Sequence, residues 1–169
     1  MLLRRCIVVI SLVTLTVAAT ALGSPPPAKL ALSPTSLGKV LADGRGRTLY
    51  LFESDRSRTS TCYGACTLSW RPFVSSAKPL AGAGLKASLI STSKRKDGRM
   101  QVVYAGHPLY FFLHDASAGQ MKGEGMGGSW FAVSAKGTKV VPASAAAPMP
   151  DPGAGYGGGY GGMDPGGYR

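Results

Sequence analysis

The sequence predicts a mainly β fold in which two tandem, related hairpin units form a small antiparallel sandwich or barrel-like domain, with one short helix near two cysteines. Three observations support this class. Apolar and polar residues alternate in several short segments, Asp-Gly and Ala-Gly pairs mark turns between them, and the middle of the chain repeats itself sixty residues later. No long segment of the folded part has helical spacing.

The repeat appears when the sequence is shifted by sixty residues without a gap. The residues that coincide are Gly46 with Gly106, Leu49 with Leu109, Tyr50 with Tyr110, Phe52 with Phe112, Asp55 with Asp115, Ser57 with Ser117, Ser69 with Ser129 and Trp70 with Trp130. Two aromatic residues, an aspartate and a tryptophan at the same spacing indicate two copies of one unit, at about 37–74 and 97–134.

Each copy contributes short strands. The alternation predicts strands at 40–42, 48–52, 89–93, 100–104, 108–113, 129–134 and 138–141, and a short helix at 62–70. Asp43-Gly44, Asp97-Gly98 and Ala105-Gly106 supply the turns between neighbouring strands.

The two ends of the chain differ from its middle. Residues 1–23 have the charged start, apolar run and small-residue end of a signal peptide, and Ser24 stands where a lipoprotein signal needs Cys. We therefore expect a cleaved, unlipidated periplasmic or secreted protein without a retained membrane span. A Pro/Ala-rich lead-in at 24–31 precedes a β domain at 32–141, and the Gly/Pro/Tyr-rich composition of 142–169 predicts a disordered tail.

Composition narrows the function. The 169 residues are 44% hydrophobic and 16% charged, with a net charge of +11, which disfavours a large multidomain enzyme, a coiled coil and a polytopic membrane protein. Signal removal leaves 17 basic against 8 acidic residues, a charge of +9. The turns carry a basic rim, formed by Arg45, Arg47, Arg56, Arg58, Lys94, Arg95, Lys96 and Arg99. Such a rim suits an anionic envelope polymer, a lipid or an acidic protein; nucleic acid is not expected as the physiological ligand.

Two cysteines, Cys62 and Cys66, remain after the signal is removed. An exported protein with one cysteine pair most simply forms one disulfide, and a separation of four residues on a helical turn allows it. A redox role stays open as the alternative, although the spacing is not Cys-x-x-Cys and no βαβ pattern surrounds it.

Neither a catalytic motif nor a tight metal-ligand cluster stands out, so no catalytic residue, cofactor or metal is predicted. The weak metal candidates are His107, His114, Met121 and Met126, and the two histidines would face opposite sides of a regular strand.

Each copy contains a Tyr-x-Phe-x-x-Asp motif. Tyr50 and Phe52 share one strand face, and Asp55 follows the strand end, where it can accept a backbone N–H or a tyrosine O–H. One interpretation is that the motif closes each hairpin and holds an aromatic core. The other is a shallow binding site where the two copies meet. The residues concerned are Tyr50, Phe52, Asp55, Trp70, Tyr110, Phe112, Asp115 and Trp130.

These motifs, together with the segment 60–66 and Gly123-Glu124-Gly125 before Trp130, resemble the bacterial secreted-repeat family, also described as predicted lipoproteins with this Tyr/Asp motif. The resemblance spans about 37–134 and implies export and a tandem-repeat fold. It implies no reaction, because the function of the family is unknown. Ser24 departs from the lipidated members.

We therefore expect an exported, non-enzymatic β-repeat module that binds an anionic envelope component or partner protein. The alternative is a periplasmic protein that handles redox equivalents or a metal, of copper or haem type.

Overall fold

The computed structural model describes residues 26–142, so the expected signal peptide and nearly all of the expected tail lie outside the described residues. The fold is mainly β, and the described residues contain no α-helix. The strands are β1 (Lys29–Thr35), β2 (Gly38–Asp43), β3 (Tyr50–Phe52), β4 (Trp70–Pro72), β5 (Leu80–Ala81), β6 (Ile90–Lys94), β7 (Met100–Tyr104), β8 (His107–Pro108), β9 (Tyr110–Phe112) and β10 (Trp130–Ala132). Three 3-10 helices accompany them: η1 (Gly64–Leu68), η2 (Ala87–Leu89) and η3 (Met126–Gly128).

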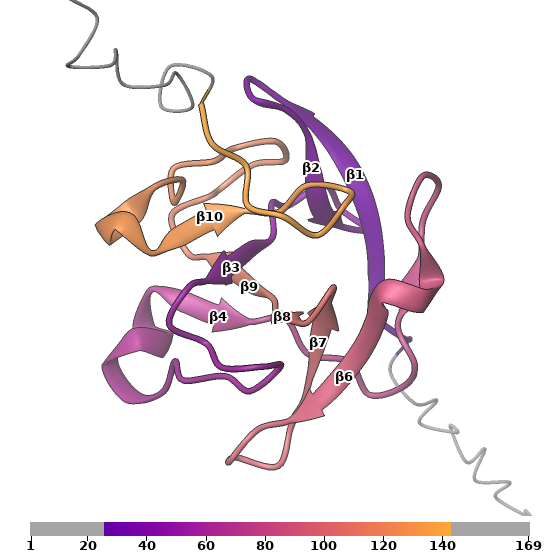
Figure 1. Ribbon diagram of the computed structural model, residues 1–169, viewed down its shortest axis with the longest axis vertical. Helices are drawn as coiled ribbons and strands as arrows, with labels where there is room; N and C mark the ends of the chain where they lie inside the picture. Colours follow the sequence, from indigo (N-terminus) through magenta and orange to yellow (C-terminus); the bar gives the residue numbers. More distant parts are fainter. Residues whose placement is uncertain (1–25, 143–169) are drawn as a thin grey trace, which may run out of the picture.

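The central sheet interleaves the two copies. Its order is β10-β3-β9-β4, so the motif strands β3 and β9 are neighbours (Figure 1). Within this pair Tyr50 lies opposite Tyr110. The last strand of each copy pairs with the motif strand of the other: β10 pairs with β3, and β4 pairs with β9. Neither copy thus completes its part of the sheet alone.

Two hairpins flank the central sheet. β1 and β2 form one, and β6 and β7 form the other (Figure 1). β5 is added in parallel to β1, and β8 is added to β7. Isolated bridges join β2 to Ser134, just beyond β10, and Gln101 of β7 to Val74, just beyond β4. These bridges link the two hairpins to opposite ends of the central sheet, so the three sheets form one connected β structure.

The alternation of the motif strands separates two apolar clusters. Tyr50, Tyr110 and both tryptophans belong to one cluster. The intervening residues Leu49, Leu51, Leu109 and Phe111 belong to the other, which also receives the hairpins. Successive side chains of a strand point to opposite faces, so the short motif strands are buried on both sides.

Several elements differ from the sequence-based expectation. The expected strand at 108–113 is divided into β8 and β9, because the chain leaves β7 at Pro108 and joins the central sheet at Tyr110. Residues 138–141 form only an isolated bridge, from Lys139 to Val133. The short helix expected near the cysteines, by contrast, is confirmed as the 3-10 helix η1. β1 starts at Lys29, inside the segment interpreted as a lead-in.

The two copies also differ in turn length. The pairing of Leu30 with Asp43 corresponds to that of Ile90 with Tyr104, so β1 and β6 are offset by sixty residues but β2 and β7 by sixty-one. The turn after β1 is one residue shorter than the turn after β6, and the turn after β2 is one residue longer than the turn after β7. The gap-free repeat therefore hides two compensating length changes.

Candidate functional site

The two Tyr-x-Phe-x-x-Asp motifs exchange partners across the boundary between the copies. The Tyr50 hydroxyl donates to Asp115 Oδ2 at 2.6 Å, and the Tyr110 hydroxyl donates to Asp55 Oδ2 at 2.7 Å. Both tyrosines are fully buried, and Asp115 is buried as well. Each motif is thus completed by the other copy.

Each motif aspartate also fastens the loop that follows its own strand. Asp55 Oδ1 accepts the Thr61 backbone N–H at 2.7 Å and the Thr61 hydroxyl at 3.0 Å. Asp115 Oδ1 accepts the Lys122 backbone N–H at 2.9 Å. The two oxygens of each carboxylate therefore tie a loop of one copy to the tyrosine of the other.

Burial shifts the protonation equilibria of these groups. Burial, together with the neighbouring carboxylate, raises the pKa of Tyr50 and of Tyr110 far above the usual range for a phenol, so both stay neutral donors. Burial likewise raises the pKa of Asp55, although the bonds from Thr61 and Tyr110 oppose that rise. These shifts follow chiefly from burial in the structural core and do not by themselves indicate catalysis.

The motif aromatics continue into a stack of four rings. Trp70 and Trp130 lie face to face, with centroids 3.8 Å apart and planes 2° apart. Phe52 stacks on Trp130 at 4.1 Å, and Phe112 packs on Trp70 at 4.6 Å. This arrangement supports the interpretation of the motif as an aromatic core, because both tryptophans are about nine-tenths buried or more.

Two hollows of unequal size flank the motif strands. The first, about 320 Å³, is lined by Phe52, Asp55 and His107. The second, about 60 Å³, is lined by Phe112, Asp115 and Arg47, the counterparts of those residues in the other copy. The guanidinium of Arg47 lies 4.1 Å from the ring centre of Phe111, at the edge of the smaller hollow. The motif residues of the two copies thus line two separate surface hollows rather than one shared site.

Cys62 and Cys66 form a disulfide across η1, with their Cα atoms 5.4 Å apart. Cys62 is buried in the aromatic cluster, and its Sγ lies 3.9 Å from the Trp70 carbonyl oxygen. The bridge therefore fixes the bend that leads into β4. A redox role for this bridge stays the untested alternative.

Arg95, which the sequence placed on the basic rim, is instead buried, with 4% of its surface exposed. Its guanidinium donates to Ser60 Oγ at 2.7 Å, Gln101 Oε1 at 2.6 Å and the Cys62 carbonyl oxygen at 2.8 Å. Ser60 also bonds the Tyr110 hydroxyl at 2.7 Å. Because that phenol gives its only proton to Asp55, the Ser60 hydroxyl supplies the proton of this bond. Arg95 therefore belongs to the polar network that supports the motif.

The other rim residues lie on the surface, apart from the half-buried Arg47. The described residues contain sixteen Lys and Arg against six Asp and Glu. Four of those cations have an acidic partner: Arg47, Arg95, Arg99 and Lys139. The other twelve are exposed and have no acidic partner within 4.0 Å among the described residues: Lys29, Lys39, Arg45, Arg56, Arg58, Arg71, Lys78, Lys86, Lys94, Lys96, Lys122 and Lys136.

The weak metal candidates lie in different surroundings. His107 lines the larger motif hollow, whereas His114 is exposed and packs on the Phe112 ring. Met121 contacts the aromatic cluster, and Met126 is 40% exposed in η3. Residues 26–142 contain no group of three or more His, Cys, Asp or Glu that could hold a metal ion.

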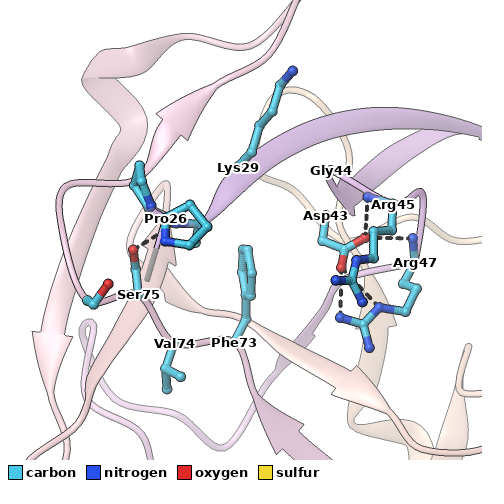
Figure 2. A pocket seen from close by; sticks show the side chains of 12 residues that line it. Pro26, Lys29, Asp43, Gly44, Arg45, Arg47, Phe73, Val74 and Ser75 are labelled. Atoms are coloured by element: carbon cyan, nitrogen blue, oxygen red, sulfur yellow. Dashed lines mark hydrogen bonds and ion pairs between the residues drawn. The ribbon is translucent and has the colours of Figure 1, made fainter. Parts of the chain in front are cut away.

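A larger cleft lies at the start of β1 and shares Arg47 with the smaller motif hollow. It measures about 530 Å³ and is lined by residues from 26–29, 43–47 and 73–76. Figure 2 shows the Phe73 ring standing between Pro26 and Ser75 on one side and the Asp43–Arg47 group on the other. Sequence reasoning singled out Arg45 and Arg47 as basic turn residues but missed Lys29 and Phe73, because neither belongs to a motif.

Comparisons with known proteins place the chain in a family. In the described part of the chain, no helix is both long and apolar enough to cross a membrane. No curated protein and no solved structure shows significant similarity to the chain. One family model matches twice, at residues 32–74 and 91–134, and these two matches are the interleaved copies that share the central sheet. With about half of its residues matched, the chain belongs to the family described as a secreted repeat of unknown function.

Proposed function

We propose that this secreted repeat protein is a non-enzymatic β module that binds an anionic component of the cell envelope through its exposed Lys and Arg side chains. The observation that carries the proposal is a difference between the acidic and the basic side chains in how many of them make contacts within the fold. The described residues carry a net charge of +10, and the few acidic groups serve internal contacts while most basic groups do not.

The acidic side chains are engaged within the fold. Asp55 and Asp115 bind the motif tyrosines, and Asp43 binds a guanidinium and two backbone N–H groups. Glu124 accepts the Ala132 backbone N–H, and Glu53 pairs with Lys139. The positive field of the twelve unpaired cations is therefore compensated by few exposed carboxylates, which favours an anionic partner.

One turn places an arginine in a strained backbone conformation. Arg56 and Thr59 exchange two backbone hydrogen bonds, so Ser57 and Arg58 form a two-residue turn with φ of 38° and 73°. Such turns favour Asn-Gly, because other residues are strained at positive φ. The turn thus exposes two arginines without an acidic partner among the described residues, Arg56 and Arg58, and Arg58 itself lies at positive φ.

The test is binding of the mature protein to vesicles. We expect it to bind vesicles that contain phosphatidylglycerol but not vesicles of phosphatidylcholine alone, with about 1 kcal/mol from each Lys or Arg near the surface. Raising the ionic strength from about 0.01 M to 1 M shortens the screening length from about 30 Å to about 3 Å and should abolish binding. Binding that ignores salt, or no binding to the anionic vesicles, would refute the proposal.

A pair of variants separates charge from shape. Arg56→Gln with Arg58→Gln removes two unpaired charges and should weaken vesicle binding by about fivefold for each charge in contact. The matched control, Arg56→Lys with Arg58→Lys, keeps both charges and should bind within about twofold of the parent protein. Equal loss in both pairs would show that the guanidinium groups, rather than the charge, are recognised.

A further inference from the structure

The cleft beside β1 combines uncompensated positive charge with an apolar wall. Three segments form it: the residues that enter β1, the turn after β2, and the residues that follow β4 (Figure 2). Its volume of about 530 Å³ lies within the range of small-molecule sites, about 300–1,000 Å³.

The cationic side of the cleft is held in place by Asp43. One carboxylate oxygen accepts the backbone N–H groups of Arg45 and Arg47 at 2.9 and 3.0 Å, and the other accepts the Arg47 guanidinium at 2.9 and 2.8 Å. Asp43 thus neutralises Arg47 and fixes the turn. The charges of Arg45 and of Lys29, whose stem lies against Gly44, remain uncompensated, and the lining has a net charge of +2.

The opposite side of the cleft is apolar. Phe73 and Val74 line it with Pro26 and Pro27, and the Phe73 ring is held edge-on against Phe111 at 5.2 Å. The Ser75 hydroxyl lies in the same wall, but it accepts the Ala28 N–H and donates to the Ala77 carbonyl oxygen. Its hydrogen-bonding capacity is largely used, so this side suits a hydrocarbon group better than a polar one.

The second copy provides a natural comparison. A cleft of about 440 Å³ there is lined by Gly84, Lys86, Leu89, Ala135 and Lys136. Leu89, Ala135 and Lys136 are the counterparts of Lys29, Ser75 and Ser76. Val133 stands at the position that corresponds to Phe73. The turn after β7 is one residue shorter than the turn after β2 and has no counterpart of Arg45. The second cleft therefore carries the cations Lys86 and Lys136, but its lining contains neither a guanidinium held by an aspartate nor an aromatic ring.

We propose that the cleft formed by Lys29, Arg45 and Phe73 binds one molecule of an anionic phospholipid. The exposed cations Lys29 and Arg45 bind the phosphate, and the first part of an acyl chain lies against Val74 and the small exposed part of Phe73. This proposal rests on the proposed function, because it names the anionic component and the place on the surface that selects it. Binding in this cleft predicts a stoichiometry of one lipid per protein, whereas diffuse electrostatic attraction predicts no fixed stoichiometry.

The test uses calorimetric titration of the mature protein with dihexanoylphosphatidylglycerol kept below its micelle concentration. We expect saturable binding of one molecule. Glycerol 3-phosphate, which lacks the acyl chains, and dihexanoylphosphatidylcholine, which lacks net charge, should each bind at least about tenfold more weakly, a difference of about 1.4 kcal/mol. Equal binding of glycerol 3-phosphate would overturn the lipid assignment in favour of a simple phosphate site.

Two charge-matched variants locate the site. Lys29→Ala with Arg45→Ala should weaken short-chain lipid binding by about tenfold or more, whereas Lys86→Ala with Lys136→Ala, in the second cleft, should change it less than about twofold. All four side chains are exposed, so both variants should keep the parent circular dichroism spectrum and unfolding midpoint.

The outcomes separate this proposal from the proposed function. Equal losses in the two variants, or saturable binding of more than one lipid, would overturn the cleft assignment while salt-sensitive vesicle binding still supports the general function. If the parent protein fails to bind anionic vesicles at all, the proposed function falls and the cleft assignment falls with it.

Discussion

Replacing Tyr50 with phenylalanine tests whether the exchanged Tyr–Asp bonds hold the two copies together. The substitution removes one hydroxyl from a fully buried ring and leaves the aromatic packing in place. The hydroxyl provides the only hydrogen bond to Asp115 Oδ2 among the described residues, at 2.6 Å. A hydrogen bond to a charged group contributes about 1.5–3 kcal/mol, so the free energy of unfolding should fall by about that amount. For a domain of this size the midpoint should fall by about 6–12 °C.

Chemical denaturation with circular dichroism measures this change. The control is Tyr63→Phe, which removes a hydroxyl that accepts the exposed backbone N–H of Lys96 at 3.2 Å. That control should change the free energy of unfolding by less than about 0.5 kcal/mol. If Tyr50→Phe is as mild as Tyr63→Phe, the exchanged bond adds no net stability. The copies would then be joined by strand pairing and ring stacking alone.

Three further predictions concern the network around the motif. Because burial raises the pKa of both motif tyrosines above 10, the unfolded state loses those protons at a lower pH than the folded state does. The free energy of unfolding should therefore fall above pH 10 by about 1.4 kcal/mol per pH unit for each tyrosine. In pH-dependent denaturation, Tyr110→Phe should remove the contribution of one tyrosine to this slope. Arg95→Met leaves three buried acceptors without their donor and should cost about 3–5 kcal/mol, whereas Arg99→Met, at an exposed ion pair, should cost less than about 1 kcal/mol in the same assay. Replacing Cys62 and Cys66 by serine opens a short loop and should cost about 2 kcal/mol or less; a loss of vesicle binding in that variant would give the disulfide a role beyond stability.

The alternation of residues predicts the faces of the motif strands but not their partners. Tyr50 and Leu51 had to face opposite sides of any strand, and they do. The same pattern is compatible with each copy folding on itself, because a sequence repeat does not say whether a strand pairs within its copy or across the boundary. The pairing of β4 with β9 and of β10 with β3 places each tryptophan on the motif phenylalanine of the other copy, a tertiary contact that the repeat does not specify.

Two local features were beyond the sequence for different reasons. β1 contains Pro34 and follows a Pro-rich stretch, so composition hides a strand that β2 and β5 support from both sides. Arg95 stands among Lys94, Lys96 and Arg99, and a run of basic residues in a turn is ordinarily solvated. Its burial depends on acceptors from Ser60, Cys62 and Gln101, which only the fold brings together.

The duplication offers a criterion for where function lies. The two copies share the tyrosines, aspartates and tryptophans of the motifs. These residues form the contacts that join the two copies. They maintain the fold and line two separate surface hollows, of about 320 and about 60 Å³. The copies diverge at the cleft beside β1. Lys29 corresponds to Leu89 in the second copy, and the longer turn after β2 contains Arg45, which has no counterpart. A binding property specific to this chain should therefore be sought in what the copies do not share, because the shared residues already have a structural reason to be present.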